Sequence, residues 1–332
     1  MGAEQYPINI MFEMKTSTKY NIVMKILITG DKGYIGSVLS LYLHTNGYEV
    51  YGIDTGFYEN NTLTKPFTNY RSLKKDIRNF KSINKLFKGV DNVFHLAALA
   101  DIVPSIENPQ NYFTTNVNGT FNVLKASLEN KVKRFIYSAS SSCYGIPKNY
   151  PTSENEKIST KYPYALTKRL GEELVLHFAD VYKLNATSLR FFNVYGKRSR
   201  TSGTYGAVFG VFLAQKIAKK PFTVVGNGMQ KRDFTHVSDI TDAVIKVSGK
   251  KNLKNKIYNV GSGKTVSINR ITELLGGKKI YIPKRPGEPE ITFADIRRIK
   301  KDIKWKPLIS IEEGVDDLKK SINDWKSAPV WT

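Results

Sequence analysis

The sequence predicts an α/β protein built on a doubly wound parallel sheet, with a smaller mixed α/β region toward the C-terminus. Apolar segments of strand length alternate with helical segments between residues 24 and 192, which is typical of a parallel sheet covered on both faces. In addition, Gly30, Gly33 and Gly36 join the first predicted strand to the first predicted helix. Small residues at that point let the backbone approach a bound phosphate group closely. We therefore expect ligands to bind beyond the carboxyl ends of the strands.

The first unit of the sheet follows a stretch without clear periodicity. Residues 1–23 lack the long apolar core of a secretory signal, and we expect them to form an N-terminal extension. A strand at residues 25–29 then leads through the glycines to an apolar helix at residues 37–45. The G-x-x-G-x-x-G spacing favours a tight turn and a helix N-terminus whose N–H groups face a pyrophosphate. This unit predicts a Rossmann-type dinucleotide site.

The second strand, residues 48–54, ends in Asp54. An acidic side chain at this point can accept hydrogen bonds from the adenosine ribose hydroxyls, and it repels a 2′-phosphate. NAD is therefore favoured over NADP. An aspartate that only caps a turn would give the same pattern.

The alternation of strands and helices continues to residue 192 and then loosens. In order, we expect a strand before Asp76, a helix at 81–88, a strand at 92–96, a helix at 110–130, and strands at 134–138 and 186–192 that flank a helix at 163–183. Further on, we expect helices at 206–219, 238–248, 267–275 and 311–326, and strands near 223–225, 257–260 and 279–282. We assign residues 24–194 to cofactor binding. We assign residues 195–332 mainly to substrate binding, with some segments returning to the sheet.

Composition limits the classes of partner and compartment. The chain has 332 residues, of which 41% are apolar and 24% charged. Cys143 is the single cysteine, which favours a reducing, cytoplasmic compartment. No apolar run is long enough to insert into a membrane. The formal net charge is +22, but the lysines are spread along the chain rather than gathered in a basic tail. We therefore do not expect a nucleic-acid partner, which salt-dependent retention of random DNA would reveal.

The helix at 163–183 carries the candidate chemistry. Pro163 suits the first helical position, and Tyr164 and Lys168 lie four residues apart on one face. A neighbouring ammonium group lowers the pKa of a phenol, so this tyrosine could act as a base. Ser140, after the strand at 134–138, could hydrogen-bond a substrate hydroxyl beside it. An exposed helix turn would also produce the Tyr-x-x-x-Lys pattern.

In combination, the motifs resemble those of the extended short-chain dehydrogenases/reductases, specifically the NAD-dependent nucleotide-sugar epimerases and dehydratases. The resemblance covers residues 24–326. The matching motifs are Gly30-x-x-Gly33-x-x-Gly36, Asp54, Asp76-Ile77, His95-Leu96-Ala97-Ala98, Asn116-Val117-Asn118-Gly119-Thr120, Ser140, Tyr164-x-x-x-Lys168, and the segments 189–196, 231–237, 258–261 and 285–288.

The resemblance implies a role for individual residues, with NAD as cofactor and no metal. The implied catalytic residues are Ser140, Tyr164 and Lys168. The implied cofactor-binding residues are Gly30, Gly33, Tyr34, Ile35, Gly36, Asp54, Asp76, Ile77, Leu96, Ala97, Ala98, Asn116, Ser138, Tyr164, Lys168 and Phe191. The implied substrate-binding residues are Ser140, Ser141, Ser142, Asn193, Val225, Arg232, Arg285, Glu288 and Thr292. The two arginines in this set suit a diphosphate.

The activity implied by the resemblance is 4-epimerisation of a nucleotide sugar, a UDP-hexose or UDP-N-acetylhexosamine, through a transient 4-keto sugar. Family dehydratases place an Asp-Glu pair where this chain has Ser141 and Ser142, so we disfavour dehydration. A decarboxylase and a 4-keto reductase remain open, although Asp54 argues against the NADPH that a reductase commonly uses. A non-catalytic NAD-binding sensor would usually lack the Tyr–Lys pair. The small Thr292 leaves room for an N-acetyl group.

The resemblance also implies a homodimer. Relatives pair through helices that correspond to residues 110–130 and 163–183. The candidate contact residues are Phe121, Val123, Leu124, Leu174 and Phe178, which could equally face the sheet.

Overall fold

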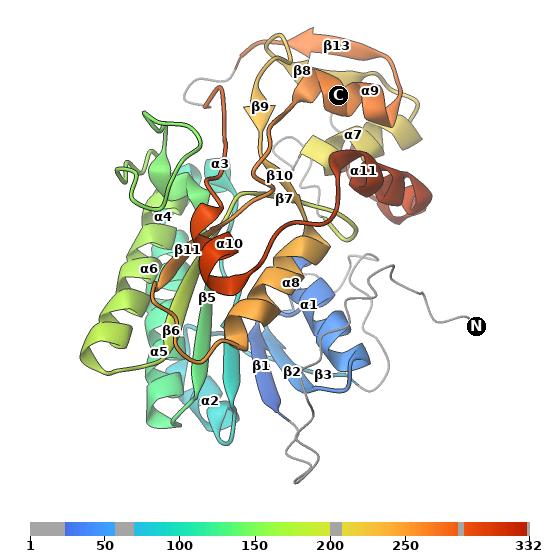
Figure 1. Ribbon diagram of the computed structural model, residues 1–332. Coiled ribbons are helices and arrows are strands. Elements are labelled where there is room, and N and C mark those ends of the chain that lie inside the picture. The colour runs from blue at the N-terminus through green and yellow to red at the C-terminus, as the bar shows by residue number, and fades with distance from the viewer. Residues whose placement is uncertain (1–23, 57–69, 200–207, 285–288, 331–332) are drawn as a thin grey trace.

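A seven-stranded sheet forms the centre of the computed structural model, which describes residues 24–56, 70–199, 208–284 and 289–330. The strands run parallel in the order β11-β6-β5-β4-β1-β2-β3 (Figure 1). Their bounds are β1 (Lys25–Thr29), β2 (Glu49–Asp54), β3 (Arg71–Lys74), β4 (Asn92–His95), β5 (Arg134–Ser140), β6 (Ala186–Phe191) and β11 (Ile257–Val260). The winding reverses between β1 and β4, and a ligand crevice is expected at such a point. The predicted Rossmann-type fold is confirmed.

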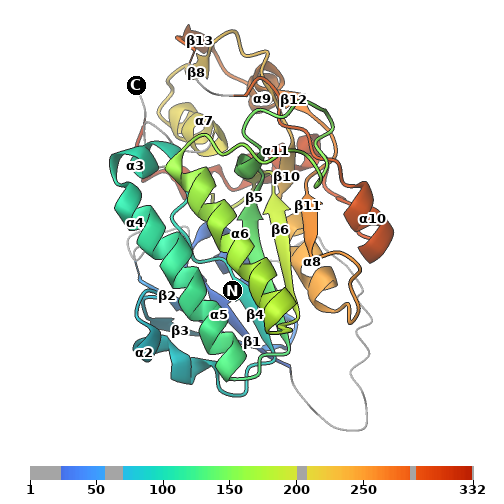
Figure 2. The same cartoon turned by 90° about the vertical axis from the view of Figure 1, so that its left-hand side faces the viewer.

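Helices cover both faces of this sheet, and the side chains of each strand alternate between them. On one face, Ile26 and Ile28 join a core with α1 (Tyr34–Thr45) and α8 (Val237–Ser248). On the other face, Leu27 joins a core with helices that include α5 (Gly119–Glu129) and α6 (Pro163–Val181). Figure 2 shows α5 and α6 lying across this second face.

The orientation of α5 and α6 corrects part of the predicted dimer contact. Val123, Leu124 and Phe178 have relative exposures of 0%, 0% and 5%, and they pack in the core beneath these helices. They face the sheet because apolar residues at helical spacing form one stripe. Phe121 lies outside that stripe and is 44% exposed.

The helix predicted at 110–130 is divided by a π-helical turn. It consists of α4 (Pro109–Phe113), the turn Thr114–Asn118, and α5. π-Turns inside helices occur frequently at functional sites. A separate short helix, α3 (Ile102–Glu107), precedes this assembly and was not predicted. The predicted helix at 81–88 is α2 (Phe80–Ile83) followed by a 3₁₀ turn, Asn84–Phe87.

A second group of elements lies beyond the carboxyl ends of the main strands (Figure 1). Its paired strands are β7 (Asn193–Tyr195) with β10 (Phe234–His236), β8 (Phe222–Val225) with β13 (Lys279–Ile282), and β9 (Lys231–Arg232) with β12 (Val266–Ser267). Its helices are α7 (Val208–Ile217), α9 (Ile268–Leu275) and α11 (Ile311–Lys320), followed by a 3₁₀ turn, Ile322–Trp325. Phe212, Phe234, Ile271 and Trp325 contribute to a core of its own.

Some segments after residue 194 belong to the main sheet. β11 pairs with β6, α8 packs on α1, and α10 (Arg297–Ile303) packs on β11. Within the described part of the chain, no helix is long and apolar enough to cross a membrane.

Candidate active site

A cleft of about 310 Å³ opens beyond the carboxyl ends of the central strands. It brings together many residues that the sequence singled out. The predicted residues that line it are Gly30, Gly33, Tyr34, Ile35, Gly36, Leu96, Ala98, Ser138, Ser140, Tyr164, Lys168 and Phe191. Residues from the loop after β1, from β5 and from α6 therefore face one space.

Two glycines of the loop after β1 have no room for a side chain. Gly30 has φ of +77°, and a Cβ atom there would lie 2.6 Å from the Ala97 nitrogen. A Cβ atom at Gly36 would lie 2.0 Å from the Gly30 carbonyl oxygen. The loop thus presents bare backbone beside the N-terminus of α1, which suits a pyrophosphate.

Asp54 lies at the end of β2 with its carboxylate held by backbone groups. Its Oδ2 accepts a hydrogen bond from the Lys32 nitrogen at 3.1 Å, and its Oδ1 accepts one from the Gly56 nitrogen at 3.3 Å. Burial raises its pKa, while these hydrogen bonds oppose the rise. Asp54 is 8% exposed and suits a ribose diol at the edge of the sheet.

Other predicted cofactor residues support the cleft from outside its lining. The Ala97 nitrogen donates to Thr29 Oγ1 at 3.2 Å. Asp76 binds Arg78 at 2.6 Å, which helps to lower the pKa of that carboxyl against the opposing effect of burial. Ile77 is buried and packs against Gly119. A Cβ atom on Gly119 would lie 2.6 Å from the Ile77 side chain.

Asn116 lies in the π-helical turn and connects the cleft wall to α6. Its side chain accepts from the Leu99 nitrogen at 2.8 Å and donates to the Leu99 oxygen at 3.0 Å. It also donates to Thr167 Oγ1 at 3.1 Å, and Thr167 donates to the Tyr164 carbonyl at 3.0 Å. Asn116 thus helps to fix the first turn of α6.

Ser140 and Tyr164 form a hydrogen-bonded pair in the cleft, and this bond lowers the pKa of the phenol. Ser140 Oγ accepts from the Ser142 nitrogen at 3.2 Å and from Ser142 Oγ at 2.9 Å. Because Ser140 already accepts these bonds, its own proton is available to the Tyr164 oxygen. Ser141 and Ser142 belong to the 3₁₀ turn Ser141–Tyr144 and do not line the cleft.

The titration of Tyr164 differs from the prediction. Burial raises its pKa to about 12 and outweighs the hydrogen bond from Ser140. The Lys168 ammonium lies 4.4 Å from the centroid of the Tyr137 ring, and burial lowers its pKa to about 7. The expected lowering of the Tyr164 pKa by Lys168 is therefore wrong for this structure, since desolvation is the dominant effect.

Asp101 is a residue of the cleft that was not predicted from the sequence. Asp101 lines the cleft and precedes α3, yet its side chain does not cap that helix. Its negative charge contributes to the raised pKa of Tyr164. The signal available in the sequence was an acidic residue shortly after His95, where β4 ends. The position of Asp101 depends on the turn before α3, and α3 was not predicted.

Among the predicted substrate residues that the structure describes, those other than Ser140 lie outside the cleft lining. Thr292 Oγ1 donates to Asn193 Oδ1 at 2.7 Å and accepts from the Asp233 nitrogen at 3.1 Å. Arg232 donates to the Lys231 and Glu290 carbonyls at 3.0 and 3.3 Å. Val225 ends β8. Arg285 and Glu288 lie outside the described residues.

A buried ion pair anchors α6 to the sheet. Arg190 on β6 binds Glu172 on α6 at 2.7 Å, and both side chains are almost fully buried. Arg190 also donates to Tyr144 Oη at 2.7 Å, and Tyr144 donates to Asn259 Oδ1 at 2.7 Å. The network fixes α6, the turn after β5, and β11 relative to one another.

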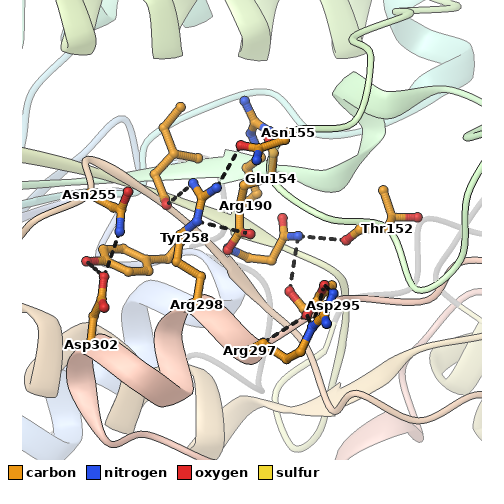
Figure 3. Close-up of polar contacts among 12 residues, drawn as sticks. Thr152, Glu154, Asn155, Arg190, Asn255, Tyr258, Asp295, Arg297, Arg298 and Asp302 are labelled. Atoms are coloured by element: carbon orange, nitrogen blue, oxygen red, sulfur yellow. Dashed lines mark hydrogen bonds and ion pairs between the residues drawn. The ribbon is translucent and has the colours of Figure 1, made fainter.

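Further polar contacts hold α10 against the loop around residues 152–155 (Figure 3). Arg298 donates to Asn155 Oδ1 at 2.7 Å and forms an ion pair with Glu154 at 3.4 Å. Asp295 binds Arg297 at 2.6 Å within the segment that leads into α10. The Arg298 contacts therefore join α10 to the loop that contains Glu154 and Asn155.

The fold and the cleft define a dinucleotide-binding α/β enzyme of the short-chain dehydrogenase/reductase type. The model of the NAD dependent epimerase/dehydratase family matches residues 26–261, and the chain belongs to this family. The glycine loop, Asp54 and the cleft fit NAD, which is the cofactor of this family.

Similar proteins are nucleotide-sugar epimerases. A UDP-glucuronate 4-epimerase from Thermodesulfobacterium geofontis is 34% identical over 316 residues, which cover 90% of this chain and 94% of the relative. The structure of a UDP-glucose 4-epimerase from Thermotoga maritima with UDP-glucose has a TM-score of 0.83 and 29% identity, covering 90% of this chain and 100% of that chain. A UDP-glucuronic acid 4-epimerase from Bacillus cereus, in complex with UDP-glucuronic acid and NAD, has a TM-score of 0.81 and 30% identity, covering 90% and 99%.

Proposed function

We propose that the protein is an NAD-dependent nucleotide-sugar 4-epimerase that acts through a transient 4-keto sugar. The observation that carries this proposal is the placement of Ser140, Tyr164 and Lys168 around one cleft beside the glycine loop. A base next to a dinucleotide site suits removal and return of a proton at a sugar hydroxyl. Residues 24–194 would bind the cofactor and residues 195–332 mainly the nucleotide sugar.

The chemistry divides between the cofactor and this chain. NAD, when bound, supplies a reversible acceptor for the hydride at C4. Tyr164 removes the proton from the C4 hydroxyl while Ser140 donates a hydrogen bond to the phenol oxygen. The hydrogen bond from Ser140 lowers the pKa of Tyr164, and the positive charge of a bound nicotinamide would lower it further. After the 4-keto sugar turns, Tyr164 returns the proton to the C4 oxygen, and because the acceptor would give the hydride back to C4 the reaction has no net redox change.

A UDP-sugar is the substrate that the relatives favour. The epimerases from Thermotoga maritima and Bacillus cereus bind UDP-glucose and UDP-glucuronic acid, respectively. We infer that Arg232 and Arg285 pair with the diphosphate, since guanidinium groups bind such anions in a bidentate manner.

Other reactions of the family are less well supported. Ser141 and Ser142 stand where dehydratases carry an acid and a base, and neither lines the cleft. A decarboxylase or a 4-keto reductase would use the same base. Incubating the protein with NAD and a panel of nucleotide sugars, with products read by NMR, separates these activities. A 4-keto-6-deoxy product without any epimer would contradict the proposal.

We further propose that Thr292 borders the sugar and admits an N-acetyl group. Its hydrogen bond to Asn193 keeps the loop at residues 289–294 against β7. Thr292→Tyr should abolish turnover of UDP-N-acetylglucosamine and spare UDP-glucose, whereas Thr292→Val should turn over both. Equal losses for the two sugars in Thr292→Tyr would contradict this placement.

We also infer a homodimer in the cytoplasm. The exposed side chains on α5 and α6 include Phe121 and Leu166, at 44% and 46% exposure, and they offer apolar contact area. The single, buried Cys143 suits a reducing compartment.

A further inference from the structure

Asp31 is a buried carboxylate within the glycine loop, between Gly30 and Gly33. It is 3% exposed, and the hydrogen-bond donors that act on its carboxylate from other residues are the Ser72 and Tyr70 hydroxyls. Asp54, by contrast, accepts bonds from two backbone N–H groups. A buried carboxylate with so little compensation is costly in its charged form. The cleft chemistry proposed above does not explain its presence.

The surroundings of Asp31 offer little compensation. Its carboxyl group packs against β2, where a Cβ atom on Gly52 would lie 2.0 Å from Asp31 Cγ. Ser72, opposite Gly52 on β3, places a buried hydroxyl beside this carboxyl group. The Tyr70 hydroxyl donates to Ser40 on α1 at 3.1 Å.

The charges that surround Asp31 come from each element packed around it. The Asp54 carboxylate on β2 acts on Asp31 by like-charge repulsion. Ser72 on β3 and Tyr70, the residue before β3, contribute hydroxyl hydrogen bonds that favour the ionised form of Asp31. On α1, His44 lies with its ring 6.1 Å from that of Tyr70. Lys32 follows Asp31 in the loop and acts on Asp54 as a favourable charge. Burial is the dominant influence, and the pKa of Asp31 rises to about 6.

We propose that Asp31 is a second specificity-determining carboxylate of the dinucleotide site. In its ionised form it places a negative charge beside Asp54, behind the loop that faces the pyrophosphate. This charge weakens the binding of NAD, and it weakens more strongly the binding of a dinucleotide with a 2′-phosphate. The inference rests on the dinucleotide site and deepens the role given to Asp54.

Protonation of Asp31 and binding of NAD are thermodynamically linked. Because the bound pyrophosphate disfavours the ionised carboxylate, NAD binding raises the pKa of Asp31 further. NAD should therefore bind most tightly below pH 6, and binding near pH 6.5 should take up protons from solution. A carboxylate with only a packing role would show neither effect.

Isothermal titration calorimetry tests the proposal on protein freed of bound dinucleotide. NAD affinity is measured at pH 5.5, 6.5 and 7.5, in buffers with different ionisation enthalpies that report proton uptake. For the wild type we expect the dissociation constant to rise about tenfold between pH 5.5 and 7.5. This is the size of effect expected when the ionised Asp31 carboxylate repels the bound pyrophosphate across the loop that separates them. For Asp31→Asn we expect the rise due to Asp31 to disappear, so that only the pH dependence contributed by Lys168 in the cleft is left. We also expect no proton uptake from residue 31, and a larger gain in affinity at pH 7.5 for NADP than for NAD.

Asp239→Asn is the matched control. Asp239 on α8 is also 3% exposed, and burial raises its pKa to about 6. Its oxygens accept hydrogen bonds from the Leu308 and Ile309 nitrogens at 2.9 and 3.1 Å, away from the glycine loop. This variant should keep the wild-type pH dependence of NAD binding.

Unchanged proton uptake and pH dependence in Asp31→Asn would overturn the proposal. If that variant does not fold, Asp31→Ser gives the same comparison. A wild-type affinity that is constant over this pH range would overturn it without any variant. Failure of the wild type to bind NAD at every pH would contradict the dinucleotide site itself.

Discussion

Two neighbouring residues shift the pKa of Tyr164 in opposite directions, and mutagenesis can separate their effects. The Ser140 hydrogen bond lowers the pKa of the phenol, and the Asp101 charge raises it. Because catalysis needs the ionised phenol, activity should rise with pH as Tyr164 loses its proton. Ser140→Ala should move this rise to higher pH, and Asp101→Asn should move it to lower pH. The pH profile of kcat/KM for each variant measures the shift, and shifts in the same direction would contradict this arrangement.

Removing the phenol hydroxyl tests the role of Tyr164 directly. Tyr164→Phe should lower kcat by about 10²–10⁴-fold, the usual contribution of a positioned acid or base. NAD affinity, measured by calorimetry, should change little. Tyr182→Phe at the end of the same helix, where Tyr182 is 49% exposed, should retain wild-type turnover. Full activity in Tyr164→Phe would assign the base to another group.

At the scale of elements, α6 is held in place by the buried pair of Glu172 and Arg190. Ser188 also donates to Glu172 at 2.6 Å. Glu172→Gln should lower the free energy of unfolding by about 3–5 kcal/mol, because it leaves the Arg190 charge buried without its counter-ion. Urea unfolding measures the loss.

The neighbouring residue on α6 provides the control. Glu173 pairs with Arg169 on the surface and is about half exposed. Glu173→Gln should change stability by less than about 0.5 kcal/mol, as is usual for surface substitutions. Equal effects of the two substitutions would contradict the anchoring role of Glu172.

The features that were predicted correctly from the sequence are those that depend only on residues close together in the chain. The glycine loop and Asp54 follow directly from the strand–loop–helix pattern, and Tyr164 and Lys168 share a face by spacing alone. The π-helical turn at Thr114–Asn118 was not predictable, because its five residues carry no side-chain pattern that separates a π-turn from an α-helical turn. Asp31 and Asp101 were missed because their surroundings depend on the packing of β3 and on the turn before α3.

At the scale of the whole molecule, the exposed face of α5 and α6 is the proposed contact between subunits. Phe121→Glu should convert a dimer to a monomer, because it places a charge in an apolar contact. Tyr281→Glu on β13, where Tyr281 is 54% exposed, should leave the dimer intact. Light scattering after size exclusion measures the mass. A dimer that survives Phe121→Glu would place the contact elsewhere.

The proposed reaction is a reversible oxidation at C4 within one cleft. The most direct test uses UDP-glucose, UDP-N-acetylglucosamine and UDP-glucuronate carrying deuterium at C4, incubated with the protein and NAD and followed by NMR. We expect a C4 epimer of at least one sugar that retains its deuterium at C4. A parallel reaction of unlabelled sugars in deuterated water should introduce no deuterium at C3 or C5. Loss of the label from C4, deuterium uptake at those neighbouring carbons, or a 4-keto-6-deoxy product in place of the epimer would contradict it.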